Sequence, residues 1–208
     1  MIPNYGNSFN VNKTDYPAGK VPVWLFVDEL YPAGCTFNDL AAGTQLPIGT
    51  PVSVSQMGAE ATVLETFEVV GAVLTTDTSV VLKSVGGILN PAKDMIVGKA
   101  SSGTIAKAVK LPAPTSVGSG DHEGEYTFAI TANSLGALSD GDILVMAGST
   151  TAPAVQTPTG LLYEAVIVGN AGATGTVVTK GQVLAKRIPA LPASIKAAIE
   201  NRITLVNE

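Results

Sequence analysis

The chain has 208 residues, of which 14% are charged, 5% are aromatic and 46% are hydrophobic. An ordinary soluble domain carries about 25% charged residues. Either Ser, Thr and Gly cover the surface of a monomer or, as the simpler explanation, part of the surface meets a partner and need not be charged. The hydrophobic content excludes an intrinsically disordered chain. The net charge of −5 argues against a nucleic-acid partner, because binding to phosphates needs clustered Lys and Arg.

Three further features exclude other classes of protein. The single cysteine, Cys35, cannot form an internal disulfide. The first residues, Met1-Ile2-Pro3-Asn4, contain neither a basic stretch nor an apolar core, so we expect no signal peptide. Residues 143–163 carry no charge, but their prolines and hydroxyl side chains argue against a membrane span.

The chain begins with a polar segment and continues as a series of short strands. Residues 1–15 alternate asparagines with Tyr5 and Phe9, which indicates an extended arm. Residues 21–27 are β-branched and aromatic, and Pro22 places this strand at a sheet edge or at a strand start. The other predicted strands are separated mostly by Gly, Asn, Asp or Pro, a spacing typical of a β-barrel or β-sandwich. They cover residues 50–55, 61–70, 79–85, 95–100, 104–109, 126–131, 143–147, 161–168, 174–179 and 182–185.

The only good helix candidate lies near the end of the chain, at residues 193–201. Pro192 can occupy its first turn, and Ile195 and Ile199 lie four residues apart on one face. Residues 203–206 predict a last strand. The sequence therefore predicts a mainly β fold of barrel or sandwich type, with one short C-terminal α-helix and an extended N-terminal arm.

The predicted organisation has two parts. Residues 1–45 form the arm and an edge strand, and residues 46–208 form a β-rich body, with a candidate subdivision near residues 111–124, where the chain is polar and rich in glycine.

A turn motif recurs along the chain. It reads Tyr16-Pro17-Ala18-Gly19, Tyr31-Pro32-Ala33-Gly34 and Leu46-Pro47-Ile48-Gly49, with Leu138-Ser139-Asp140-Gly141 as a looser copy. Pro fixes φ at the second position, and Gly accepts a positive φ at the fourth. Two interpretations stay open: the repeated use of a common turn, and a partial duplication of the chain.

His122, the only histidine, does not indicate a metal or catalytic site. Asp121, Glu123 and Glu125 flank it, but the surrounding glycines indicate a mobile, solvated loop. A structural zinc site needs four ligands, usually Cys or His. A Ser-His-Asp triad would have to recruit this same histidine, and the sequence contains no Gly-x-Ser-x-Gly motif.

The carboxylates and the thiol give no stronger signal. The pairs Glu65/Glu68 and Asp140/Asp142 lack the aromatic platforms that a glycosidase would need, and Asp beside a turn glycine is common for local hydrogen bonding. Cys35 has no histidine nearby and is interpreted as a plain free thiol. We therefore expect no enzymatic activity, no catalytic residue, no cofactor and no metal ion.

The remaining signal is a long stretch with almost no charge. Glu164 is the only charged residue in residues 143–179. A stretch of this kind forms either core or a contact between subunits.

The C-terminal part resembles a known family. The run Gly160-Leu161-Leu162-Tyr163-Glu164-Ala165-Val166 precedes a Gly/Ala/Thr-rich stretch, the segment Lys180-Gly181-Gln182-Val183-Leu184, and the closing helix and strand. It is similar to the tail of the lambda-type head decoration proteins of tailed phages, although Ala165 stands where that family commonly has Asp. The resemblance covers residues 138–206 and, more weakly, residues 46–85. The first 45 residues, which it does not cover, suggest an elaborated version such as an auxiliary or head-fibre protein.

The resemblance implies a non-enzymatic virion protein, made in the bacterial host cytoplasm and located on the outer surface of the capsid. It implies a homo-oligomer, expected to be a trimer, that binds the major capsid protein and cements neighbouring capsomers, with no nucleic-acid or membrane partner. The arm would add a strand to an exposed edge of the capsid protein. The candidate residues for contacts with the capsid or between subunits are Tyr5, Phe9, Tyr16, Trp24, Phe26, Leu161, Leu162 and Tyr163.

Two other functions stay open from the sequence. The first is a trimeric adhesin or carbohydrate-binding module on a phage or cell surface, which would need an exposed cluster of aromatic residues or carboxylates. The second is an enzyme such as a hydrolase, for which the sequence offers few acids and bases.

Overall fold

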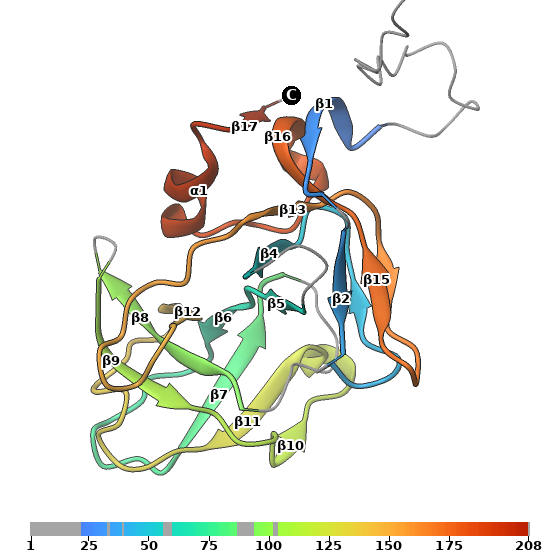
Figure 1. The fold of residues 1–208 in the computed structure, drawn as a ribbon. Coiled ribbons are helices and arrows are strands. Elements are labelled where there is room, and N and C mark those ends of the chain that lie inside the picture. The colour runs from blue at the N-terminus through green and yellow to red at the C-terminus, as the bar shows by residue number, and fades with distance from the viewer. Residues whose placement is uncertain are drawn as a thin grey trace, which may run out of the picture.

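The computed structural model of the chain describes residues 22–32, 34–38, 40–55, 60–86, 94–101 and 104–207. Within these ranges the protein is mainly β, with several antiparallel sheets and one short C-terminal α-helix (Figure 1), which confirms the predicted fold class. The predicted arm at residues 1–15 lies outside the described residues.

A six-stranded sheet joins the two ends of the described chain. Its strand order is β1-β16-β13-β4-β5, and β17 pairs in parallel with β16. β1 stands at one end of this order, as Pro22 predicts. The bounds are β1 Trp24–Leu30, β4 Pro51–Val54, β5 Ala61–Val63, β13 Gly160–Leu162, β16 Val177–Leu184 and β17 Ile203–Val206.

A seven-stranded antiparallel sheet contains the middle of the chain. Its strand order is β10-β11-β7-β6-β12-β8-β9. The bounds are β6 Thr66–Val69, β7 Ser79–Ser84, β8 Ile96–Ser101, β9 Thr104–Lys110, β10 Ser116–Val117, β11 Glu125–Ala129 and β12 Ile143–Met146.

The remaining elements of the described residues are two short two-stranded ribbons, two 3-10 helices and one α-helix. One ribbon pairs β2 with β15, and the other pairs β3 with β14. The bounds are β2 Cys35–Phe37, β3 Gln45–Leu46, β14 Val166–Ile167, β15 Ala173–Gly175, the 3-10 helices η1 Gly120–His122 and η2 Ala185–Arg187, and the helix α1 Ala193–Ile199.

The main core lies between the two large sheets. Alternation along β6, β7 and β11 turns Phe67, Leu82 and Phe128 to the same side, where they are fully buried. Residues of the six-stranded sheet and of α1, including Leu161 and Ile195, belong to the same hydrophobic cluster. The two large sheets are therefore parts of one packed unit.

A second core covers the other face of the six-stranded sheet. Neighbouring residues of β13 point to opposite cores, because Leu161 packs in the main cluster and Leu162 in the cluster that contains Phe37 and Val52. The β2–β15 and β3–β14 ribbons add Cys35, Leu46 and Val166 to this second cluster, and the six-stranded sheet supplies most of its other members. The architecture is thus layered and sandwich-like, with the six-stranded sheet buried on both faces.

The chain order corrects the predicted domain boundaries. β1, β2 and β3 pair with β16, β15 and β14, so residues 24–46 are integral to the body. Residues 111–124 connect β9 to β11 and contain β10, all of which belong to one sheet. The seven-stranded sheet instead consists of the continuous segment 66–146, inserted between β5 and β13 of the other sheet.

Several predicted strands differ in their bounds. The predicted strand 61–70 divides at Leu64 and Glu65, where the chain passes from the six-stranded to the seven-stranded sheet. The predicted strand 161–168 divides into β13 and β14, and the helix ends two residues earlier than predicted, at Ile199. β2, β3 and β10 were not expected from the sequence.

The recurring turns have the predicted glycine conformation. Gly34, Gly49 and Gly141 have φ of 65°, 80° and 80°, while Gly19 lies outside the described residues. Of the two proline-containing copies within the described residues, the Tyr31 copy has proline at the predicted position and the Leu46 copy does not. The Gly34 N–H donates to the Tyr31 carbonyl at 3.3 Å, but the next copy closes one residue later, with the Thr50 N–H donating to the Pro47 carbonyl at 3.2 Å.

Candidate interaction surfaces

Trp24 and Tyr163 are the two candidate contact residues that the fold brings together. The Trp24 Nε1–H donates to the Tyr163 carbonyl at 3.0 Å, and the two rings are stacked with centroids 6.4 Å apart. Trp24 is buried in the main core and Tyr163 is half-buried. The pair therefore connects β1 to the residue that follows β13. Of the two side chains, only Tyr163 has appreciable exposed surface.

The other candidates have different environments. Leu161 and Leu162 are completely buried inside the chain. They pack in the two cores, which corrects their predicted place at an interface. Phe26 is half-buried on β1. Tyr5, Phe9 and Tyr16 lie outside the described residues.

The nearly uncharged stretch 143–179 divides into core and exposed surface. Residues 144–146 of β12, all of β13, and Val177 and Val178 of β16 are buried, whereas Ile143 is exposed. Most residues of the segments 148–157 and 164–174 are exposed or half-buried, and Glu164 is the only charged residue in either segment. Ile167 on β14 is 69% exposed, the highest value among the exposed large hydrophobic residues.

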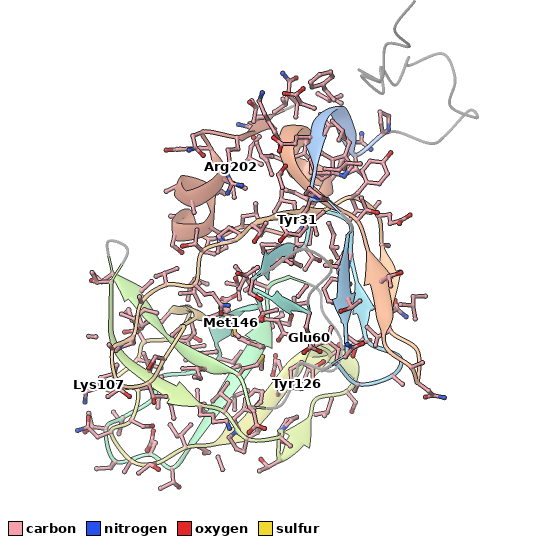
Figure 2. All side chains as sticks on the ribbon, in the orientation of Figure 1. Tyr31, Glu60, Lys107, Tyr126, Met146 and Arg202 are labelled. Atoms are coloured by element: carbon pink, nitrogen blue, oxygen red, sulfur yellow. The ribbon has the colours of Figure 1, made fainter. Side chains whose placement is uncertain are left out.

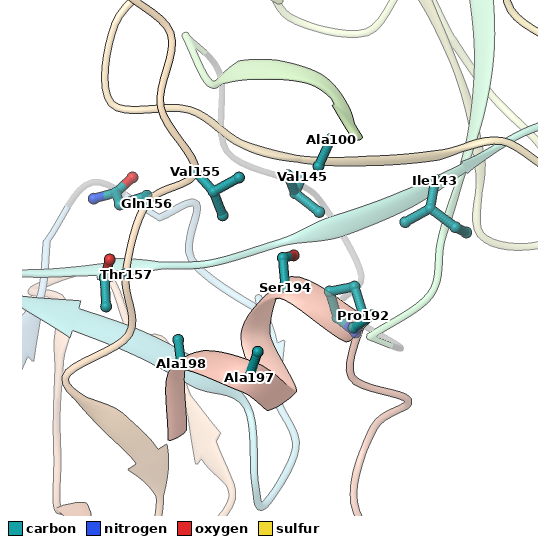
Figure 3. Close-up of a pocket in the computed structure, with 11 residues that line it drawn as sticks. Ala100, Ile143, Val145, Val155, Gln156, Thr157, Pro192, Ser194, Ala197 and Ala198 are labelled. Atoms are coloured by element: carbon teal, nitrogen blue, oxygen red, sulfur yellow. The ribbon is translucent and has the colours of Figure 1, made fainter. Parts of the chain in front are cut away.

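A groove of about 660 Å³ lies between β12 and helix α1. Ile143, Val145 and Val155 line one side, and Ser194 and Ala197 of the helix line the other (Figure 3). None of the residues that line this groove has an ionisable side chain. The groove can therefore accept an apolar group, but its walls contain no acid, base or charged nucleophile.

The helix turns small side chains into the groove for a simple reason. Ile195 and Ile199 are buried in the main core, and a helical repeat of 3.6 residues puts Ala193, Ser194 and Ala197 on other faces. On the opposite wall, Val145 is the centre of a small cluster on the outer face of β12, against which Val155 packs. Both walls therefore rest on well-packed elements.

Asp140 and Asp142 accept hydrogen bonds that hold turns and strands together. Asp142 Oδ2 accepts hydrogen bonds from the Ser139 N–H at 2.8 Å and from Lys99 Nζ at 2.6 Å. Lys99 first, and then the Ser139 N–H, hold the pKa of the Asp142 carboxyl below its usual value. Asp140 Oδ1 accepts the Gly71 N–H at 2.7 Å. The Ser139 bond of Asp142 is the local hydrogen bond predicted beside a turn glycine, whereas the Gly71 partner of Asp140 lies 69 residues away in the sequence.

The histidine and the cysteine lie apart from one another in very different surroundings. His122 Nδ1 lies 3.0 Å from Glu125 Oε2 on an exposed loop. Cys35 is buried, and its Sγ lies 3.5 Å from the Gly175 carbonyl oxygen, to which it donates. Burial raises the pKa of the Cys35 thiol to about 11. Within the described residues, no three His, Cys, Asp or Glu side chains are grouped so as to hold a metal ion.

Arg202 is a structural cation that the sequence did not single out. Its guanidinium donates to the Thr159 carbonyl at 2.7 Å and to the Pro158 carbonyl at 3.2 Å, and Figure 2 shows it beside α1. These bonds hold the segment that leads into β13 against the turn after α1. A lone arginine after a helix carries no sequence pattern that would reveal such a partner.

Comparisons with known proteins give no relative. No protein-family model, no curated protein and no solved structure matches the chain. No helix within the described ranges is long and apolar enough to cross a membrane.

Proposed function

We propose that the chain is a non-enzymatic structural protein of a tailed-phage virion. It binds the major capsid protein on the outer face of the capsid as a homo-oligomer, with a trimer as the expected form. The observation that carries the proposal is the exposed, nearly uncharged surface of residues 148–157 and 164–174. Such surface is favourable to bury between proteins, because few ionised groups lose their hydration.

The motif behind the family resemblance has a physical role that supports the proposal. A Cβ atom on Gly160 would lie 2.1 Å from the Val178 carbonyl oxygen, so only glycine lets β13 approach β16 this closely. The next two residues, Leu161 and Leu162, fill the two cores. The first three residues of the run that resembles decoration proteins are thus needed for the packing of β13 in this layered fold.

Oligomeric binding would give the protein its effect on a capsid. Three linked contacts dissociate together far less readily than one, because each bound copy keeps the others at a high effective concentration. The N-terminal segment would supply a further contact, with Tyr5, Phe9 and Tyr16 as its anchors, since aromatic residues dominate the energy of many interfaces.

The test is binding to capsids of the phage that encodes the chain, purified without this protein. We expect the protein to sediment with these capsids and to raise their melting temperature, and capsids of an unrelated phage serve as the control. Absence of both effects would overturn the proposal.

A second measurement addresses the arm and the alternative function. A variant lacking residues 1–15 is expected to bind the same capsids more weakly, and unchanged binding would remove the arm from the proposal. Specific binding to a glycan array, together with failure to bind capsids, would support the adhesin or carbohydrate-binding alternative instead.

A further inference from the structure

The groove beside α1 has a counterpart elsewhere on the same chain. We define the ribbon surface as the exposed residues of β14, β15 and the turn between them, which are Ile167, Gly169, Asn170, Ala171 and Thr174. None of them is charged, and Ile167 is 69% exposed. The ribbon surface thus offers an apolar side chain, whereas the groove offers an apolar cavity.

The two surfaces face away from each other in one copy. Figure 1 shows α1, β8 and β9 on one side of the molecule and the β2–β15 ribbon on the other, and β14 lies against β15. Ile167 therefore has no route into the groove of its own chain. A second copy can present it without any change in the fold.

Charge favours a second copy as the occupant. A partner with a charged docking segment would lose hydration in the groove without gaining a countercharge, because no lining residue is ionisable. A segment without charge avoids this loss of hydration. The ribbon surface is such a segment, because it is exposed, apolar at Ile167 and free of charge.

We propose that the ribbon surface of one copy docks into the α1 groove of the next, with Ile167 against Ile143, Val155 and Ala197. The contact joins two different patches, so it is heterologous, and repeating it generates a ring when the rotation between copies closes. This inference rests on the homo-oligomer in the proposed function and names the surfaces that hold it together.

The contact is tested by placing one charge on each side. Ile167→Asp alters the ribbon surface, and Ala197→Glu alters the groove at an exposed helix position. The matched controls are Leu74→Asp, at a residue that is 62% exposed, and Ala129→Glu on β11, both outside the two surfaces. In sedimentation velocity over a concentration series, we expect oligomers from the wild type and both controls. Each of the two test variants should associate about tenfold more weakly or worse.

A mixture of the two variants provides the decisive measurement. The Ala197→Glu copy retains an intact ribbon surface and the Ile167→Asp copy retains an intact groove, so one contact remains possible between them. We expect a 1:1 dimer that does not grow further. Circular dichroism checks that each variant is folded, and the milder changes Ile167→Ser and Ala197→Gln replace any variant that is not.

The outcomes separate this contact from the proposed function. A monomeric wild type, an unchanged mass of either variant, or a mixture that stays monomeric would overturn the contact. If the wild type and the variants associate as expected but the protein does not bind capsids, the virion function is overturned and the contact between copies is supported.

Discussion

At the scale of single residues, the buried thiol of Cys35 gives a direct test of the second core. Because burial raises its pKa to about 11, we expect a thiol reagent at pH 8 to label the folded protein very slowly. In denaturant the same thiol should react at once, since the thiolate is the reactive form. Rapid labelling of the folded protein would contradict the burial of Cys35.

The same shift predicts how stability depends on alkaline pH. The folded pKa is raised above the ordinary thiol value of 9.0, so the contribution of Cys35 to stability is fully present below pH 9 and is lost as pH rises through 11. We expect the free energy of unfolding to fall more between pH 8 and pH 10.5 in the wild type than in Cys35→Ala. Equal slopes in the two proteins would contradict the shift.

Gly160 tests the close approach of β13 and β16. A Cβ atom there would lie 2.1 Å from the Val178 carbonyl oxygen, whereas at Gly148 it would meet nothing within 4 Å. We therefore expect Gly160→Ala to lower the free energy of unfolding by about 1 to 3 kcal/mol and Gly148→Ala to leave it nearly unchanged. Denaturant titration of both variants gives the comparison, and equal effects would refute the steric argument.

Residue patterns alone predicted some roles and missed others. The positive φ of Gly49 follows from its place in a turn, and the inward face of α1 follows from the spacing of Ile195 and Ile199. Leu161 and Leu162 were assigned to an interface because an apolar run does not reveal how many of its faces are covered. The groove is not predictable from the sequence, because its lining residues come from four separate segments of the chain.

At the scale of elements, Asp142 joins the turn before β12 to β8. Its carboxylate accepts hydrogen bonds from Ser139 and Lys99, so we expect Asp142→Asn to cost about 1 kcal/mol at pH 7. The folded pKa is lowered from 3.8, so this stability is present above pH 3.8 and is lost as pH falls through the folded pKa.

The measurement is denaturant unfolding at several values of pH between 7 and 3. The difference between wild type and Asp142→Asn should shrink as the pH falls. Lys110→Met is the control, because it removes an ion pair with Asp94 in which both side chains are largely exposed and should change stability little. A constant difference down to the lowest pH would argue against the carboxylate as its source.

Two of the strands that the sequence does not reveal, β2 and β3, are created by distant pairing. β2 and β3 have three and two residues, too few to display an alternation. They are strands because β15 and β14, more than 100 residues later, lie beside them. The split of the predicted strand 61–70 has a similar cause, since β5 and β6 pair in different sheets.

At the scale of the whole molecule, the shared core implies a single unfolding transition. Trp24 in the six-stranded sheet and Phe128 in the seven-stranded sheet belong to one hydrophobic cluster, so neither sheet can lose its packing alone. Trp24 is the only tryptophan and its fluorescence reports on one sheet, while far-ultraviolet circular dichroism reports on both. We expect the two signals to change at the same denaturant concentration. Two separate midpoints would show that the sheets unfold independently.

The pairing of β1 with β16 also determines when the six-stranded sheet can form during translation. Thr179 on β16 donates a hydrogen bond to the Glu29 carbonyl across 150 residues of sequence. At about 5–20 residues per second, a ribosome needs roughly 8–30 s between these two residues. During that interval β1 has no partner for its backbone groups and the main core lacks one wall. Synthesis therefore proceeds with an open β-edge, and completion of the sheet is a late event that follows translation of nearly the whole chain.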